Sequence, residues 1–128
     1  MLTLPARGEF LNDEMALNAL VQRLVDRIRP VAIFLFGSRA LGQHRPDSDF
    51  DLLLITRPED GDAGRDYVRP LRAVADLCVN VEIVPIRFDE FDAELNSDTS
   101  LIPDVMRYAR ELYRDASCPP IPRLAHQR

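Results

Sequence analysis

Two aspartates at the start of an apolar run are the residues of this chain with the clearest chemical use. Asp49 and Asp51 flank Phe50, and the run continues to Ile55. Side chains alternate along a strand, so we expect both carboxylates on one face, with Cα atoms about 7 Å apart. Two negative charges held this close repel each other, and they stay ionised only with a cation between them or where the strand end is open to water. Ligands that are all oxygen select Mg²⁺ or Mn²⁺.

A glycine and a serine upstream of this pair offer a place for a phosphate group. Gly37 and Ser38 directly follow the apolar run 31–36. Where a strand turns into a short helix, backbone N–H groups are exposed, and Gly37 lacks the Cβ that would keep an anion away. A phosphate cradle facing a metal-binding pair indicates phosphoryl or nucleotidyl transfer. The alternative is structural, with Ser38 as a cap and the two aspartates as solubilising residues at the mouth of a strand.

The strands and helices that would position these residues follow from the apolar spacing. Asn12 or Asp13 is expected to cap a first helix that ends before Pro30. Continuous apolar runs predict buried strands, and an alternating run with a proline near its end predicts a third strand at a sheet edge. Helical spacing predicts three further helices. In chain order, the predicted strands are residues 31–36, 50–55 and 79–86, and the predicted later helices are residues 67–78, 88–95 and 101–114.

The expected organisation is one domain followed by a proline-rich tail. Residues 1–115 form the predicted domain, and residues 116–128 form a flexible tail. We expect removal of this tail to leave folding nearly intact. The predicted elements use almost all of the domain, so nothing remains to build a second domain that would orient an acceptor. We therefore expect another chain to present the acceptor.

Composition and charge exclude several classes of protein. The 128 residues include 16 Lys plus Arg against 21 Asp plus Glu, a formal net charge of −5, which argues against a nucleic-acid polymer as the main partner. Cys78, Cys118, His44 and His126 are too isolated in sequence to form a zinc site. The longest apolar run is far shorter than a membrane span, and the start does not resemble a secretory signal. We expect a cytoplasmic protein without a membrane partner.

The spacing Gly37-Ser38, ten residues, Asp49-x-Asp51 resembles the signature of the DNA-polymerase-β-type nucleotidyltransferase superfamily. The chain length, and the helix ahead of residues 31–36, resemble the minimal nucleotidyltransferase (MNT) branch. Many members of that branch are antitoxins encoded beside a helical partner of the HEPN type. The resemblance implies an α/β (α+β) fold with a small mixed β-sheet and flanking helices, the nucleotidyltransferase fold.

The resemblance also implies residue roles. A third carboxylate is expected on a later strand, where this chain has Glu82 instead of the usual aspartate. The extra methylene shifts the carboxylate by about one bond length, and near-attack geometry is sensitive to shifts of order 1 Å. With ATP as substrate and two Mg²⁺ ions as cofactors (Mn²⁺ also fits), the implied catalytic and metal-binding residues are Asp49, Asp51 and Glu82. The implied nucleotide-binding residues are Gly37, Ser38, Arg39 and Ser48.

Some of these residues also have simpler interpretations. Glu82 could be a solvent-facing strand residue, and arginine in a polar loop such as Arg39 is more often solvated than bound to phosphate. Ser48 is expected to cap or orient the turn before Asp49. The acidic run Asp89–Glu94 is expected to solvate a helix, with a surface for a basic partner as the alternative.

Two functions follow from the resemblance. The first is Mg²⁺-dependent transfer of AMP from ATP to a hydroxyl of a HEPN-type partner protein, with tyrosine as the expected acceptor, in an MNT/HEPN toxin–antitoxin pair. The second is a binding module that neutralises or scaffolds a helical partner with little or no catalysis, which the Glu82 departure keeps open. A small-molecule nucleotidyltransferase of the aminoglycoside type is weaker, because those enzymes normally carry an extra helical domain.

Overall fold

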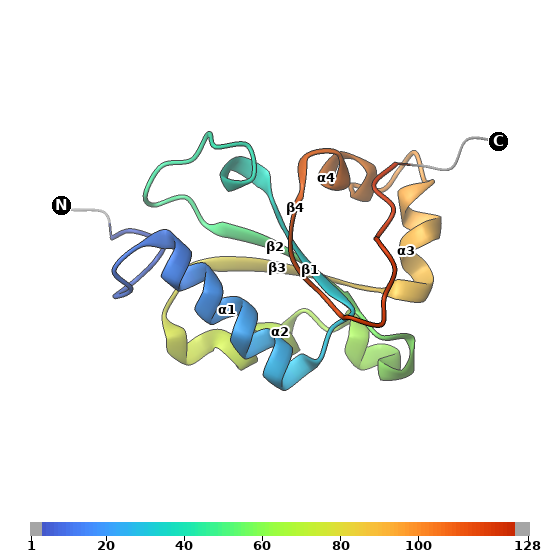
Figure 1. Ribbon diagram of the computed structural model, residues 1–128, viewed down its shortest axis with the longest axis horizontal. Coiled ribbons are helices and arrows are strands. Elements are labelled where there is room, and N and C mark those ends of the chain that lie inside the picture. Colours follow the sequence, from blue (N-terminus) through green and yellow to red (C-terminus); the bar gives the residue numbers. More distant parts are fainter. Residues whose placement is uncertain (1–3, 125–128) are drawn as a thin grey trace.

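A four-stranded sheet with helices on both faces forms the centre of the computed structural model, which describes residues 4–124 (Figure 1). The strand order is β3-β2-β1-β4. β1 pairs antiparallel with both β2 and β4, whereas β2 and β3 are parallel. The sheet is therefore mixed, as predicted. The strands are β1 (Ala32–Phe36), β2 (Phe50–Thr56), β3 (Val81–Arg87) and β4 (Arg110–Arg114).

The first face of the sheet is covered by α1 (Asp13–Ile28) and α2 (Val68–Val74). Asn12 caps α1, because its side chain accepts a hydrogen bond from the Met15 N–H at 2.8 Å, as expected for a residue type that caps helices well. The helix then buries an apolar stripe with helical spacing. The buried residues of α1 are Ala16, Leu17, Leu20, Val21, Leu24 and Ile28.

The second face carries α3 (Phe88–Leu95) and α4 (Ile102–Tyr108), seen on the opposite side of the sheet from α1 and α2 in Figure 1. Phe91, Leu95 and Met106 are fully buried there against the sheet. Alternation along β2 assigns Leu52 and Leu54 to the first face, and Leu53 and Ile55 to the second. None of the helices between residues 4 and 124 combines the length and the apolarity needed to cross a membrane.

The predicted helix over residues 101–114 is wrong in its second half. α4 ends at Tyr108, and Arg110–Arg114 forms β4 at the edge of the sheet. A bulge explains why the pattern looked helical: Ile33 pairs with Tyr113, but Phe34 pairs with Glu111, so the strand contains one extra residue. Two adjacent residues of β4 consequently pack toward the same core, which breaks the alternation that identifies a strand.

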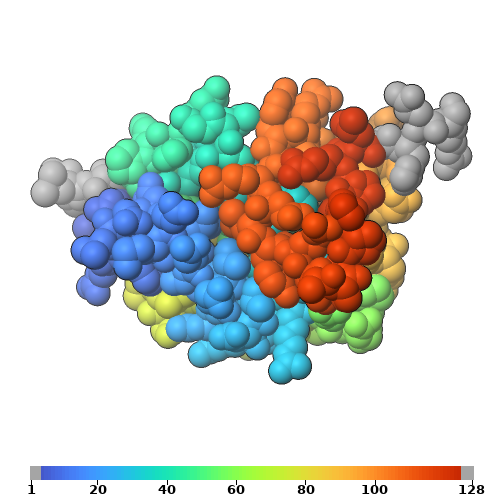
Figure 2. Space-filling model, viewed as in Figure 1, coloured from blue at the N-terminus to red at the C-terminus, as the bar shows by residue number. Residues whose placement is uncertain are grey.

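The segment after β4 packs against the second face. Ile121 is only 7% exposed and belongs to the same cluster as Phe34 and Met106. The Arg123 guanidinium donates a hydrogen bond to the Ala109 carbonyl and lies over the Phe34 ring. Figure 2 shows this segment, in red, as part of the surface beside β4 and α4. Residues 125–128 of the predicted tail lie outside the described residues, and the boundary at residue 115 stays a prediction.

Because Ile121 is buried, we revise the expectation that loss of the tail has little effect. Ile121→Ala is expected to lower the free energy of unfolding by about 2 kcal/mol, the low end for a buried isoleucine because the site is near the surface. Urea unfolding measures the change. Leu124→Ala is the matched control, since Leu124 is exposed and the substitution should stay within about 0.5 kcal/mol. Equal effects of the two substitutions would contradict this packing.

Candidate active site

The register of the sheet brings three segments together at one end. Phe36 pairs with Asp51 across β1 and β2, and Asp51 pairs with Glu82 across β2 and β3. Gly37 directly follows Phe36, so the end of β1 and the starts of β2 and β3 meet. Asp51 precedes Leu53 by two residues, which places its side chain on the second face. The predicted carboxylate from the third strand therefore lies beside the predicted pair.

Gly37 is required by both backbone conformation and space. Its φ is +74°, which L side chains rarely adopt. A Cβ at this position would lie 2.3 Å from the Asp51 Oδ2 atom. The Asp51 carboxylate thus occupies the space that a side chain at residue 37 would fill. The turn after β1 and the carboxylate of β2 are therefore in direct contact.

The electrostatic environment of Asp51 is unfavourable for a negative charge. Burial, together with the like charges of Glu82 and Asp49, raises the pKa of the Asp51 carboxyl to about 6 from its usual 3.8. The Glu82 carboxyl also lies within hydrogen-bonding reach of Asp51, and two carboxyl groups can hydrogen-bond only if one of them holds a proton. The positive charge of Arg39 lowers the pKa of Asp51, but by less than burial and the two like charges raise it. A divalent cation would replace that proton and stabilise both carboxylates.

The other two carboxylates are more open to solvent. Asp49 directly precedes β2 and is exposed, and Glu82 is also exposed. Among residues 4–124, no three acidic, histidine or cysteine side chains form a metal site by themselves. Magnesium usually takes only one or two protein carboxylates and completes its coordination with phosphate oxygens and water. The crowded Asp51, its neighbour Glu82 and the nearby Asp49 fit that kind of partial site.

The two predicted serines differ in what they do. Ser38 lies in the 3₁₀ turn η1 (Gly37–Arg39), and its hydroxyl has no hydrogen-bond partner among the described residues. The first N–H groups of such a turn have no partner within it. The N–H and the hydroxyl of Ser38 can therefore both donate hydrogen bonds to a phosphate oxygen. The Ser48 hydroxyl instead accepts the Arg45 N–H at 3.0 Å. Ser48 thus caps the turn before Asp49, in agreement with its simpler interpretation.

Arg39 has a structural environment that does not support the predicted phosphate contact. Its side chain is only 3% exposed. The guanidinium donates to the Asp13 carboxylate and to the Ser48 carbonyl, both at 2.9 Å, with further bonds to the carbonyls of Arg45 and Pro46. It also lies 4.0 Å from the centre of the Phe50 ring. We therefore assign Arg39 to holding the loop that leads into Asp49.

The partners of Arg39 are the supporting residues that the sequence did not reveal. Asp13 was predicted only as a helix cap, and Phe50 only as a strand residue. Asp13 and Phe50 contact Arg39 only because the first turn of α1 lies against the loop 40–49. No local sequence pattern encodes that packing. The one sequence feature that indicates such a network is Arg39 itself. An arginine at the end of a strand has five N–H donors, which either bind a ligand or donate hydrogen bonds to several backbone carbonyls.

Fold and site together define a class. A mixed sheet that carries a glycine–serine turn beside carboxylates on two neighbouring strands is the arrangement expected of nucleotidyl transfer. The chain belongs to the nucleotidyltransferase-domain family, whose family model matches residues 17–123. That range includes the turn after β1, both aspartates and Glu82. No curated protein matches the chain in sequence.

Two solved structures are similar to the chain. One is described as the crystal structure of a toxin–antitoxin with AMP-PNP; it has a TM-score of 0.54 and 21% identity, and the match covers 77% of this chain and 73% of that one. The other is a candidate nucleotidyltransferase from Sulfolobus solfataricus, with a TM-score of 0.43, 15% identity, and coverage of 77% and 90%. At 21% identity, the likeness to the first of these structures concerns the fold alone.

Proposed function

We propose that this chain transfers AMP from ATP to a hydroxyl group of a partner protein in the cytoplasm, with Mg²⁺ as cofactor. The expected acceptor is a tyrosine, and the expected partner is a helical HEPN-type toxin for which this chain is the antitoxin. The family supports nucleotidyl transfer, and the toxin–antitoxin neighbour supports a protein partner. The observation that carries the proposal is the contact of Gly37 with Asp51 beside Glu82.

Each residue of the site has a distinct task in this reaction. The turn at Gly37 and Ser38 would hold the β- and γ-phosphates, while Asp49 and Asp51 would hold the metal ions. Divalent ions, when bound, neutralise charge on the phosphates. The acceptor oxygen forms a bond to the α-phosphorus, the bond to the β-phosphate oxygen breaks, and pyrophosphate leaves. The acceptor proton passes to the Glu82 carboxylate, which is exposed and beside Asp51.

Binding of nucleotide and metal together is the first test. An ATP analogue with a non-cleavable α,β bond, at a hundred times its dissociation constant with Mg²⁺, should stabilise the protein by about 2.7 kcal/mol. For a chain of this size the thermal midpoint would rise by on the order of 10 °C. Analogue or Mg²⁺ alone should give a much smaller shift. The measurement is a thermal melt in each of these conditions.

Transfer itself is tested with α-labelled ATP, Mg²⁺ and the protein encoded beside this chain. Label should appear on the neighbour and should disappear with Asp49→Asn. Asp47→Asn is the matched control, because Asp47 lies in the same loop and pairs with Arg45. Unchanged binding of the neighbour with no label would instead support the binding module, which the exposed and longer Glu82 favours. No thermal shift with nucleotide would contradict both the site and its chemistry.

A further inference from the structure

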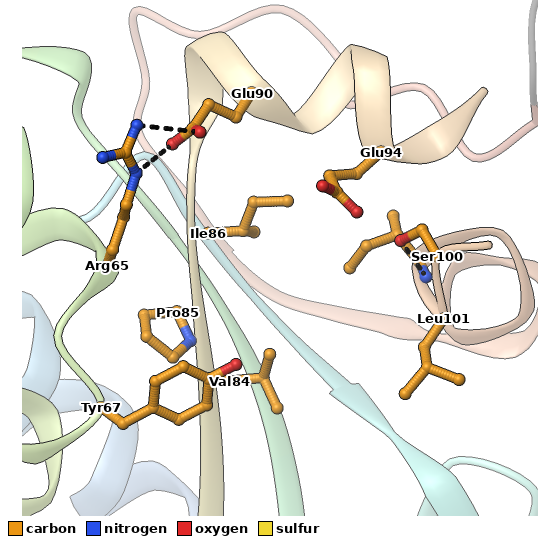
Figure 3. Close-up of a pocket in the computed structure, with 10 residues that line it drawn as sticks. Arg65, Tyr67, Val84, Pro85, Ile86, Glu90, Glu94, Ser100 and Leu101 are labelled. Carbon is orange, nitrogen blue, oxygen red and sulfur yellow. Dashed lines mark hydrogen bonds and ion pairs between the residues drawn. The ribbon is translucent and has the colours of Figure 1, made fainter. Parts of the chain in front are cut away.

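A cavity of about 400 Å³ lies along the outer side of β3 and is not used by the chemistry described above. Its lining includes Val84 and Ile86 of β3, Tyr67 before α2, Glu94 of α3 and Leu101 before α4. In Figure 3, Tyr67 and Leu101 stand on opposite sides of this space, and the Glu94 carboxylate points into it. We call this cavity the β3 groove.

The β3 groove and the carboxylate site lie along the same face of the sheet. Glu82, Val84 and Ile86 alternate to the same side of β3, which is the side facing α3 and α4. The groove therefore begins one strand repeat, about 7 Å, beyond Glu82. It ends near Ile86, about 13 Å from Glu82. A molecule that meets the proposed proton acceptor can extend directly into the groove.

The walls of the groove are apolar and exposed. Tyr67 is 57% exposed and Leu101 is 77% exposed, so the two walls present apolar surface to the solvent on both sides of the groove. Val84 and Ile86 form the floor between them. The volume lies within the range that holds a small ligand or a few side chains. An occupant with apolar side chains would cover these residues, and the burial of their apolar surface would stabilise the complex.

The charge of the groove excludes phosphate and favours a cation. Of the arginines that the structure describes, Arg65 is the only one that lines the groove. It donates to both oxygens of Glu90, at 2.8 and 3.0 Å, as Figure 3 shows. Among the described residues, Glu94 has no basic partner. The groove thus presents one uncompensated negative charge beside apolar walls. A triphosphate would be repelled, whereas a lysine or arginine next to an apolar residue would be complementary.

We infer that the β3 groove is the acceptor-binding site, and that its occupant is an extended segment of a protein substrate with an apolar and a basic side chain. This inference rests on the proposed function and adds the substrate class. An extended peptide advances about 3.3–3.6 Å per residue, so the 13 Å from Glu82 to Ile86 corresponds to about four residues. The basic residue should therefore lie three to five positions from the modified hydroxyl.

An oriented peptide library tests this inference. The peptides carry one central tyrosine and six randomised positions on each side, without serine, threonine or cysteine. They are incubated with ATP and Mg²⁺, and the AMP-modified products are sequenced by mass spectrometry. Wild-type protein should enrich lysine and arginine three to five positions from the tyrosine, with apolar residues beside them. Glu94→Lys should reduce this enrichment about tenfold, the effect of one favourable charge pair, and should shift it toward aspartate and glutamate.

Controls separate this inference from the proposed function. Asp26→Lys makes the same charge change on the exposed side of α1, across the sheet, and should leave the peptide preference unchanged; Glu94→Gln tests the loss of charge without a new one. Modification without charge preference, or the same preference in Glu94→Lys, would overturn the inference and leave nucleotidyl transfer in place. Nucleotide binding without any modified peptide would also overturn it, as would labelling of kanamycin alone, which would assign the groove to small polycations. Absence of nucleotide binding would be the failure of the proposed function.

Discussion

Asp51→Asn is expected to abolish AMP transfer and, at the same time, to raise the thermal midpoint of the ligand-free protein. In the proposed reaction, Asp51 would hold an ion that neutralises charge on the reacting phosphates, so loss of its charge should lower the rate on the order of a thousandfold. The stabilisation has a separate cause. Asp51 is partly buried beside Glu82 and Asp49, so its ionised form is costly until a cation is bound. An asparagine of the same shape removes that cost and can donate a hydrogen bond to Glu82.

The raised pKa of Asp51 determines how the stability gain of Asp51→Asn should change with pH. The pKa of Asp51 is raised to about 6 in the folded protein from the usual 3.8, so the folded state binds this proton more tightly than the unfolded state does. The wild type therefore loses stability as the pH rises from about 4 to above 6. The gain in thermal midpoint from Asp51→Asn should be largest above pH 6 and should shrink toward pH 4. Melts in a metal-free buffer with chelator would measure it.

Asp47→Asn serves as the control for both effects. Asp47 lies close in sequence but pairs with Arg45 in the loop, so neither transfer nor the pH profile of stability should change strongly. A midpoint for Asp51→Asn that is below wild type at pH 7.5, or a difference that does not vary with pH, would contradict the electrostatic account. Residual transfer near the wild-type rate would contradict the role of Asp51 in catalysis.

Arg39→Met is expected to be among the most destabilising single substitutions in the chain. Methionine keeps the apolar contact with Phe50 but leaves the Asp13 carboxylate and the carbonyls of Arg45, Pro46 and Ser48 without their donor. Removal of one partner from a buried charged network costs about 3–5 kcal/mol. We expect about 3 kcal/mol here, because Asp13 is partly exposed to water. Urea unfolding measures the loss.

A second arginine of the same loop provides the comparison. The Arg45 side chain is 84% exposed, and Arg45→Met should change the free energy of unfolding by less than about 0.5 kcal/mol. If the two substitutions have similar effects, the assignment of Arg39 to a structural network is wrong. Nucleotide binding by Arg39→Met, measured with an osmolyte that restores folding, distinguishes the two roles further. If Arg39 binds phosphate directly, the folded variant should still have a lower affinity for nucleotide.

Much of the fold could be predicted because it depends on local patterns. The first helix has a polar cap and an apolar stripe, and β1 and β2 are short runs of branched and aromatic residues bounded by polar loops. Asp49, Asp51 and Gly37 could be found for the same reason, since each stands at a strand end. Glu82 was singled out through the family resemblance, and the register of β2 and β3 pairs it with Asp51; its role stays a prediction.

The features that were missed depend on contacts between distant segments. The sequence pattern of β4 predicts a helix because its bulge conceals the alternation of a strand. The pairing of β4 with the edge of β1 could not be predicted either, because nothing in the sequence of β4 indicates that partner. The tail was predicted to be free because its prolines suggest an extended chain, yet Ile121 packs into the second core. The network of Arg39 joins α1 to the loop before β2, and no sequence window contains both.

The proline in β3 has a consequence for behaviour at high concentration. The Phe50 N–H donates to the Asn80 carbonyl at 3.0 Å. In this register, the even-numbered residues of β3 direct their N–H and C=O groups toward β2. The odd-numbered residues, Pro85 among them, direct these groups away from β2, toward the open edge of the sheet. At Pro85 no N–H is available to a strand from another molecule, and the opposite rim, β4, is lined with charged side chains. Neither rim is a good template for strand addition, so ribbon-like self-association is disfavoured, and the unliganded protein should tolerate crowding without aggregating through its sheet.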